Sequence, residues 1–235
     1  MLPPFARTAL LLDLDGTLLD IAPTPDSVVV PDGLIDTLIA LQTALGGALA
    51  IVTGRAIPVV DGFLCHPFAV AGEHGGAIRT APGGAIDRPD LPSVPAAWID
   101  RAEALAAAHP GAIMERKARG FAMHFRGTPA SGSLFHAALT ALVESAPGFQ
   151  LMPGLMLWEI RPLGADKGSA VATLMAQPPF LGRLPLFIGD DVTDEDGMRV
   201  ARIMGGAGLR VDAAFGSPTG VRAWLAKAAE MREWP

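Results

Sequence analysis

The sequence contains four short apolar runs, each of which ends at polar or glycine-rich residues. Runs this short that lack a polar side are typical of strands buried on both faces of a parallel sheet. Between the first two runs, apolar residues spaced three and four apart share one helical face. Strand, helix and strand in succession are the unit of a parallel sheet, and they predict an α/β fold. The apolar runs are residues 9–12, 48–52, 68–71 and 184–188.

A different pattern interrupts this series in the middle of the chain. Apolar and polar residues alternate there, which is typical of strands that expose one face to water. We therefore expect a small α+β domain at 81–162, inserted into an α/β core made of residues 1–80 and 163–235. The predicted strands of the insertion are 112–117, 120–126 and 155–161, and its predicted helices are 98–108 and 134–143.

Composition excludes several classes of protein. Half of the residues are apolar and 18% are charged, so the chain can bury a core and is not disordered. The formal net charge of −6 argues against a nucleic-acid binder that relies on broad phosphate neutralisation. Charges and glycines interrupt the long apolar stretches, and the first thirty residues lack the features of a signal peptide. We expect a cytoplasmic monomer with no membrane segment, in which the lone Cys65 is a buried apolar residue.

The polar residues that follow the predicted core strands form the main candidate site, because ligands of open α/β sheets bind at the carboxyl ends of the strands. Asp13 and Asp15 follow the first run, and Thr53 follows the second. Taken alone, such residues also occur in turns and helix caps, and Lys167 could be a solvated side chain at a helix start. Five acids between residues 190 and 196 make a poor turn and a suitable cation site.

Phosphoryl transfer explains why these residue types belong together. A carboxylate nucleophile is repelled by a phosphate monoester, whose charge is spread over three oxygens. A divalent metal ion and a cationic side chain remove that repulsion. Carboxylate and carbonyl oxygens are ligands that Mg²⁺ accepts.

Together and in this order, the four signals resemble the motifs of the haloacid dehalogenase superfamily of phosphohydrolases. The resemblance implies a Rossmann-like parallel-sheet core with an inserted α+β cap, a bound Mg²⁺ ion and an aspartyl-phosphate intermediate. It implies that Asp13 is the nucleophile and that Asp15 is the general acid and base. It also implies phosphoryl binding by Thr53 and Lys167, and Mg²⁺ ligation by Asp190 together with Asp13 and the main-chain carbonyl group of Asp15, with Asp194 as a further acid of the metal site.

The inserted domain offers acids and bases at alternate positions of its predicted strands. Such a face is either an ordinary solvated sheet or a surface for a hydroxyl-rich ligand, because each sugar hydroxyl both donates and accepts a hydrogen bond. The candidate substrate-binding residues on this face are Glu115, Lys117, His124, Arg126 and Glu159, and Arg161 is expected beside them.

Several strings resemble the trehalose-6-phosphate phosphatase family more specifically. They are GEHG at 72–75, ERK at 115–117, HFR at 124–126, WEIRP at 158–162 and GDDVTDED at 189–196. The resemblance implies hydrolysis of trehalose 6-phosphate in trehalose biosynthesis, with Glu115, Lys117 and Glu159 on the hydroxyls of the distal glucose. It places Arg55 and His74 near the junction of core and cap, in a binding or a structural role.

Three alternatives remain open at this point. The first is a phosphatase for another sugar phosphate, such as sucrose phosphate or a glycosylglycerol phosphate. The second is a non-catalytic sugar-phosphate sensor, which the presence of Asp13, Asp15, Lys167 and Asp190 disfavours. The third is a phosphotransferase that passes the phosphoryl group to a second sugar.

Overall fold

The computed structural model describes residues 1–22, 24, 27–117 and 119–235, and its contacts divide the chain into two units. The first unit combines Met1–Pro89 with Asp166–Pro235, and the second unit is Asp90–Ala165. The first unit is therefore made of two chain segments, and the second is a single continuous segment.

The first unit is built on a six-stranded sheet of order β10-β9-β1-β2-β3-β4. Neighbouring strands run parallel, except that β4 is antiparallel to β3. Because β1 pairs with both β2 and β9, segments far apart in the sequence become neighbours in the sheet. The strands are β1 (Thr8–Leu12), β2 (Leu49–Val52), β3 (Ala69–Gly72), β4 (Ala77–Arg79), β9 (Leu184–Gly189) and β10 (Ala207–Arg210).

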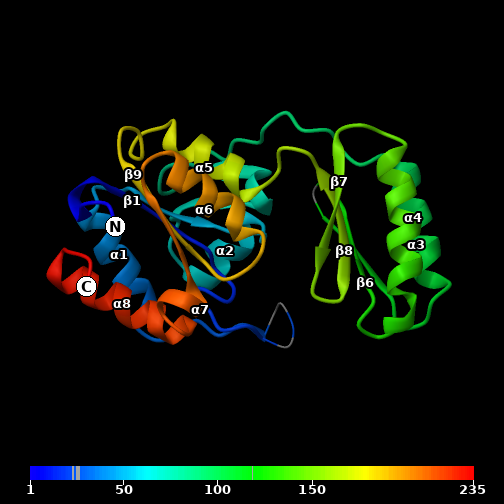
Figure 1. Ribbon diagram of the computed structural model, residues 1–235, viewed down its shortest axis with the longest axis horizontal. Coiled ribbons are helices and arrows are strands. Elements are labelled where there is room, and N and C mark those ends of the chain that lie inside the picture. The colour runs from blue at the N-terminus through cyan, green and yellow to red at the C-terminus, as the bar shows by residue number, and fades with distance from the viewer. Residues whose placement is uncertain (23, 25–26, 118) are drawn as a thin grey trace. The chain divides into compact units, whose positions relative to one another are not determined.

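Helices cover both faces of this sheet, which explains why its strands are apolar without alternation (Figure 1). Along β1, Leu10 and Leu12 pack with one set of helices, whereas Ala9 and Leu11 pack with the other. This arrangement confirms the expected α/β class with a parallel-sheet core. The first set is α1 (Leu34–Ala44), α2 (Ile57–Leu64), α7 (Val211–Ala214) and α8 (Pro218–Met231), and the second is α5 (Lys167–Met175) and α6 (Asp194–Ile203).

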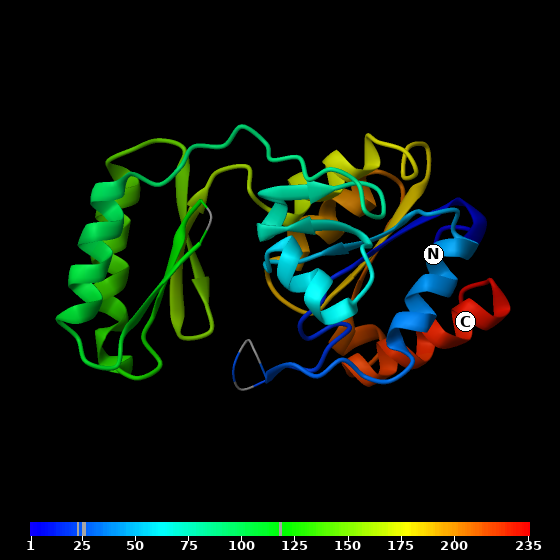
Figure 2. The ribbon, with the colours of Figure 1, turned by 180° about the vertical axis from the view of Figure 1, so that it is seen from behind.

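The two ends of the chain meet in the first unit (Figure 2). The indole N–H of Trp234 donates a hydrogen bond to the carbonyl oxygen of Pro3 at 3.0 Å. The Trp234 ring stacks on Trp224 with the ring centroids 4.9 Å apart, and it also contacts Phe5 in the 3₁₀ helix η1 (Phe5–Arg7). The last residues are thereby tied to the segment that precedes β1.

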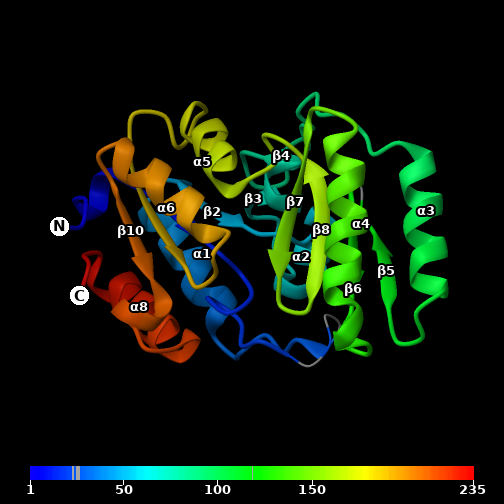
Figure 3. The ribbon, with the colours of Figure 1, turned by 45° about the vertical axis from the view of Figure 1, so that its right-hand side comes forward.

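The second unit is an antiparallel four-stranded sheet of order β5-β6-β8-β7 with two helices on one face (Figure 3). Phe121, Met123 and Ile160 point toward the helices and form a core with Trp98 and Phe135. This unit confirms the expected α+β insertion. Its elements are α3 (Ala96–Ala107), β5 (Ile113–Arg116), β6 (Phe121–His124), the 3₁₀ helix η4 (Pro129–Ser131), α4 (Gly132–Glu144), β7 (Phe149–Gly154) and β8 (Leu157–Pro162).

Three expectations from the sequence are wrong. Strand β6 ends at His124, and a turn closed by the hydrogen bond from the Thr128 N–H to the carbonyl oxygen of Phe125 follows, so Arg126 lies in that turn and is exposed. Cys65 is exposed because it ends α2 in a left-handed conformation with φ of 47°. Arg161, expected on an open face, is buried.

No helix within the described residues is both long and apolar enough to cross a bilayer.

Candidate active site

The candidate active site begins at the carboxyl ends of three adjacent strands. Asp13 directly follows β1, Thr53 follows β2 and Asp190 follows β9. Leu12, the last residue of β1, pairs with Ile51 of β2 and with Ile188 of β9, so the three strands end at the same edge of the sheet. The sheet topology therefore brings together polar residues that lie far apart in the sequence.

Lys167 is the buried cation of this site. It is the first residue of α5, where the side chain of Asp166 accepts a hydrogen bond from the Ser169 N–H at 2.8 Å and caps the helix. Lys167 Nζ donates to Asp13 Oδ1 and to Asp194 Oδ1, each at 2.6 Å. The ammonium group thus joins the residue after β1 to the first residue of α6.

Burial acts on the two partners in opposite ways. It raises the pKa of Asp13 from 3.8 to about 8, although the attraction of Lys167 acts in the other direction. Burial would lower the pKa of Lys167, but the carboxylates of Asp13 and Asp194 outweigh it and raise that pKa above its usual value. Lys167 is therefore charged at neutral pH, whereas Asp13 needs further positive charge nearby to be fully ionised.

Asp190 is held by its side chain and by its backbone. The Thr17 hydroxyl donates to Asp190 Oδ1 at 3.0 Å, and the Asp190 N–H donates to Asp194 Oδ2, also at 3.0 Å. Two glycines permit this close packing, because a Cβ at Gly16 would collide with the Asp190 carboxylate and a Cβ at Gly189 would collide with Asp194. Gly16 also has a positive φ of 83°, which glycine adopts most readily.

Asp13, Asp190 and Asp194 form a cluster that fits a divalent cation. Each offers a carboxylate oxygen, and these three atoms lie within 4.8 Å of one another. When all three acids are ionised, the charge of Lys167 leaves two negative charges in excess. Burial also raises the pKa of Asp190, so added positive charge would relieve both Asp13 and Asp190. An oxygen-only donor set with this charge suits Mg²⁺.

Asp15 faces a different partner. Its two carboxylate oxygens accept hydrogen bonds from Arg55 Nε at 2.6 Å and Arg55 Nη2 at 2.8 Å. The Arg55 guanidinium group also lies over the Phe63 ring of α2, 4.9 Å from its centroid. The structure thus places Arg55, which the sequence suggested as a substrate-binding residue, against the carboxylate of Asp15.

Thr53 and His74 surround the loop that carries Arg55. Thr53 is buried, and its hydroxyl accepts a hydrogen bond from the Arg55 N–H at 3.2 Å. The His74 N–H donates to the carbonyl oxygen of Thr53 at 3.0 Å. The His74 ring packs against Gly54, where a Cβ would collide with it. His74 therefore contributes to the shape of the loop after β2.

The charged residues of the second unit form two ion pairs on the open face of its sheet. Lys117 Nζ lies 3.0 Å from Glu159 Oε1, and His124 Nε2 lies 2.9 Å from Glu115 Oε2. Glu115 and Glu159 are both paired across strands with Ala122, so their side chains share one face. The hydrogen bond from His124 lowers the pKa of Glu115, although partial burial acts in the opposite direction.

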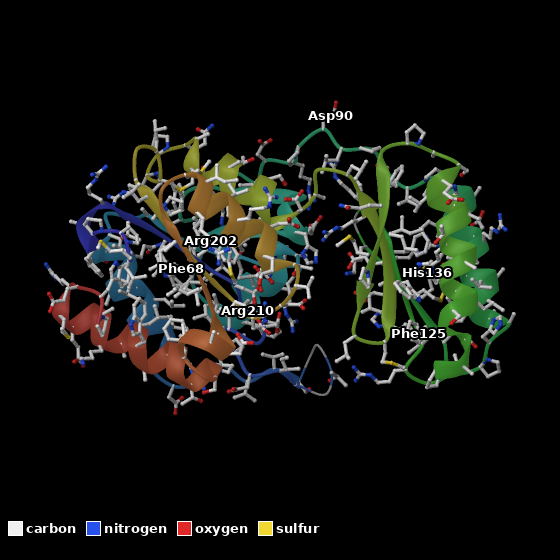
Figure 4. All side chains as sticks on the ribbon, viewed as in Figure 1. Phe68, Asp90, Phe125, His136, Arg202 and Arg210 are labelled. Atoms are coloured by element: carbon white, nitrogen blue, oxygen red, sulfur yellow. The ribbon has the colours of Figure 1, made fainter. Side chains whose placement is uncertain are left out.

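The opposite face of that sheet carries aromatic side chains. Trp158 contacts Phe125 and the His136 ring of α4, with ring centroids 6.3 Å and 4.5 Å away (Figure 4). The indole N–H of Trp158 donates to the carbonyl oxygen of Gly132 at 2.9 Å. This packing holds the strand on which Glu159 lies, and Arg126 is exposed in the turn after β6.

Sequence reasoning missed two residues that contact Asp190. Thr17 lies in the same loop as Asp13 and Asp15, so a buried hydroxyl after the paired acids was a usable signal. Arg210 donates to the carbonyl oxygen of Asp190 at 2.7 Å. It lies twenty positions away on an edge strand, and the sequence carries no pattern that marks it.

Comparison with known proteins places the chain in a family. Residues 11–220 match the family model described as trehalose-phosphatase. The chain is 39% identical over 209 residues to a trehalose-6-phosphate phosphatase of Escherichia coli strain K12, covering 88% of this chain and 78% of that protein. It is 41% identical over 209 residues to a probable trehalose-phosphate phosphatase of Sinorhizobium fredii, covering 86% and 77%.

A solved structure shows the same fold. The C-terminal domain of Candida albicans trehalose-6-phosphate phosphatase superimposes with a TM-score of 0.77 at 20% sequence identity, covering 96% of this chain and 93% of that one. The sequence identity to the two bacterial relatives and the match over residues 11–220 also establish the family. The chain belongs to the trehalose-phosphatase family.

Proposed function

We propose that the protein is a magnesium-dependent phosphatase that hydrolyses trehalose 6-phosphate to trehalose and phosphate, acting as a cytoplasmic monomer in trehalose biosynthesis. The observation that carries the proposal is Lys167, which is buried and shared by Asp13 and Asp194 beside Asp190. A buried lysine between two carboxylates neutralises only part of their charge, so the site can take a cation, and the lysine and that cation together would bring an anion to an acidic nucleophile. Membership of the trehalose-phosphatase family supports the choice of substrate.

The reaction proceeds in two transfers of the phosphoryl group. A carboxylate oxygen of Asp13 attacks phosphorus, the bond from phosphorus to the sugar oxygen breaks with its electron pair going to that oxygen, and Asp15 gives the oxygen a proton. Water then attacks phosphorus and gives a proton to Asp15, and the bond between Asp13 and phosphorus breaks. Asp13 is regenerated, and phosphate leaves.

Three features of the site support these roles. Lys167 contacts Asp13 directly, and Thr53 follows β2, the strand next to β1. Both residues would bind phosphoryl oxygens during the transfer. Arg55 bonds to both oxygens of the Asp15 carboxylate, so it holds Asp15 near Asp13, and one of these bonds must open before Asp15 carries the proton that it donates. The Asp13–Asp190–Asp194 cluster, with the carbonyl group of Asp15, would hold Mg²⁺, which supplies the positive charge that lets a carboxylate approach a phosphate dianion.

We propose that the open face of the second unit recognises the sugar. Glu115, Lys117 and Glu159 offer acceptors and a donor on one face, with His124 beside them. Both ion pairs are partly exposed, so sugar hydroxyls can exchange with these partners at lower cost than in a fully buried pair. Arg126 lies in the turn after β6, so its part in binding is at most peripheral to this face.

The test is phosphate release from a panel of sugar phosphates, measured with Mg²⁺ and with excess chelator. We expect trehalose 6-phosphate to give the highest kcat/KM, well above those of glucose 6-phosphate, sucrose 6-phosphate and glucosylglycerol phosphate. Chelator should abolish all of these activities. A kcat/KM for trehalose 6-phosphate no better than for glucose 6-phosphate would refute the substrate, and full activity in chelator would refute the metal.

A further inference from the structure

Arg210, which is labelled in Figure 4, bonds to the backbone of Asp190, one of the three acids of the candidate metal site. It is the last residue of β10, and it pairs with Gly189, the residue before Asp190. Its three guanidinium nitrogens each have a different partner. Nη2 donates to the carbonyl oxygen of Asp190 at 2.7 Å, Nη1 to Glu195 Oε1 at 2.8 Å, and Nε to Asp212 Oδ1 at 3.1 Å. The side chain thus joins the ends of β9 and β10 to the starts of α6 and α7.

Arg210 provides one of three hydrogen bonds that hold Asp190 through its backbone and its side chain. Its N–H donates to Asp194, its Oδ1 accepts from Thr17, and its carbonyl oxygen accepts from Arg210. The last of these bonds fixes the peptide plane that follows Asp190. A carboxylate on a residue held at three points has little freedom to turn away from a cation.

We propose that Arg210 is a positioning residue for Mg²⁺, which holds the backbone of Asp190 so that its carboxylate faces the ion together with Asp13. This inference rests on the proposed function, because it takes the Asp13–Asp190–Asp194 cluster as the metal site. Arg210 itself makes no contact with Asp13 or Asp194 among the described residues, so it acts through Asp190.

Geometry and charge predict opposite effects for the loss of Arg210. A positive guanidinium near a cation site repels the cation, so its removal should tighten Mg²⁺ binding if charge alone mattered. That repulsion is already offset by Glu195 and Asp212, which both bond to the guanidinium group. If Arg210 positions Asp190, its removal should instead weaken Mg²⁺ binding. The sign of the change therefore separates the two explanations.

The test is calorimetric titration of the full-length, substrate-free protein with Mg²⁺. For Arg210→Met we expect about a tenfold weaker Mg²⁺ affinity, as is usual when a partner of a metal ligand is removed. Arg210→Lys keeps the charge but loses the fork that reaches three acceptors, and we expect at least a roughly threefold loss. Arg199→Met is the matched control, because Arg199 lies on α6 and pairs with Asp196 at 3.2 Å. Its Mg²⁺ affinity should equal or slightly exceed that of the wild type.

Steady-state kinetics provide a second readout. At saturating Mg²⁺, Arg210→Met should recover most of its kcat with an unchanged KM for the sugar phosphate, because a general loss of structure would not be rescued by the ion. Circular dichroism identifies the folded variants, and if Arg210→Met does not fold, Arg210→Lys decides the question. An unchanged or tighter Mg²⁺ affinity in the folded variant overturns the positioning role. A wild type that does not bind Mg²⁺ at all overturns the metal assignment, and this inference with it.

Discussion

Each unit carries a lysine paired with carboxylates, but in contrasting surroundings: Lys167 bonds to two acids, and Lys117 pairs with one. The Lys167 side chain is 4% exposed, and its partners Asp13 and Asp194 are 6% and 0% exposed. The Lys117 side chain is 29% exposed, and Glu159 is 13% exposed. In the first unit the charged groups are paired with one another in the interior, whereas in the second unit they are partly accessible to water. The contrast separates a site whose charges are already paired in the interior from a face whose charged groups stay accessible to a ligand.

Desolvation explains what each arrangement does. Removing a carboxylate from water is costly, and a partner that is also buried restores only part of that energy. The site of the first unit therefore has excess negative charge, which a metal ion would offset. An exposed pair gains about 1 kcal/mol or less, so sugar hydroxyls can replace it easily.

The largest effect is expected from Asp13→Asn. If Asp13 is the nucleophile, as we propose, this substitution should lower kcat by about 10⁴-fold or more. The metal-free protein should nevertheless be at least as stable as the wild type at pH 8, because Lys167 keeps Asp194 as its partner and a buried charge is lost. Phosphate release and thermal unfolding in chelator measure the two quantities. Asp196→Asn, in an exposed acid of α6, is the matched control and should change neither appreciably.

The same substitution should change the pH dependence of stability. In the metal-free protein the pKa of Asp13 is raised from 3.8 to about 8, so the folded state keeps a proton that the unfolded chain has lost. The stability from this group is present below pH 3.8 and is lost as the pH rises through about 8. Wild-type melting temperature in chelator should therefore fall between pH 5 and pH 8 more steeply than that of Asp13→Asn. Parallel curves would contradict the raised pKa.

The next effect compares the two lysines directly. Lys167→Met leaves two buried carboxylates without their cation and should cost about 3–5 kcal/mol of unfolding free energy. Lys117→Met removes the equivalent charge from the open face of the second unit and should cost about 1 kcal/mol or less. Urea denaturation of both variants in chelator measures the difference. Equal losses would show that burial does not distinguish the two sites.

Glu159→Ala tests whether the open face recognises the sugar. We expect kcat/KM for trehalose 6-phosphate to fall about 10- to 100-fold, the value of one or two hydrogen bonds to a charged group. Activity on a small aryl phosphate, which has no second sugar, should stay within about twofold. The control is Glu103→Ala. Glu103 lies on helix α3, which covers the other face of the sheet, and it pairs there with Arg116. Equal losses on both substrates in Glu159→Ala would remove it from the recognition site.

The smallest effect is expected from His124→Gln. Loss of the hydrogen bond from His124 should let the pKa of Glu115 rise toward its ordinary value, which carbon-detected NMR titration measures. Because the pair is exposed, kcat/KM for trehalose 6-phosphate at pH 7 should change less than about fivefold. His136→Gln, on the helix-covered face, should leave the Glu115 pKa unchanged. A Glu115 pKa that does not respond to His124→Gln would contradict the contact.

Local sequence patterns predicted most of the strands of the core, but they did not predict the contacts between residues that are distant in the sequence. The apolar runs predicted β1, β2, β3 and β9 because burial on both faces leaves a continuous signature. Strand β7 (Phe149–Gly154) was missed because it contains proline and glycine, and α2 was missed because Pro58 and Gly62 weaken its helical pattern.

The candidate site shows the same division. Asp13, Asp15, Lys167 and Asp190 could be identified in the sequence only as a set in this order, because each of them alone also fits a turn, a helix cap or a solvated side chain. The pairing of Arg55 with Asp15 and that of Arg210 with the Asp190 backbone depend on which loops face each other, and spacing along the chain does not encode that. Predicting Cys65 as buried relied on a residue-type average, which its position at the end of α2 overrode.

The split of the first unit has a consequence for how the protein is made. Strand β1 pairs with β9, whose residues are translated only after the whole of the second unit, and Lys167 is 154 positions from Asp13. The continuous second unit can collapse through contacts closer in sequence while the ribosome is still extending the first, and the long-range pairing must wait. We therefore expect the nucleophile and its lysine to meet among the last events of biogenesis. A chain released before Lys167 is synthesised would then lack the contact with Asp13, and we expect it to have no phosphatase activity.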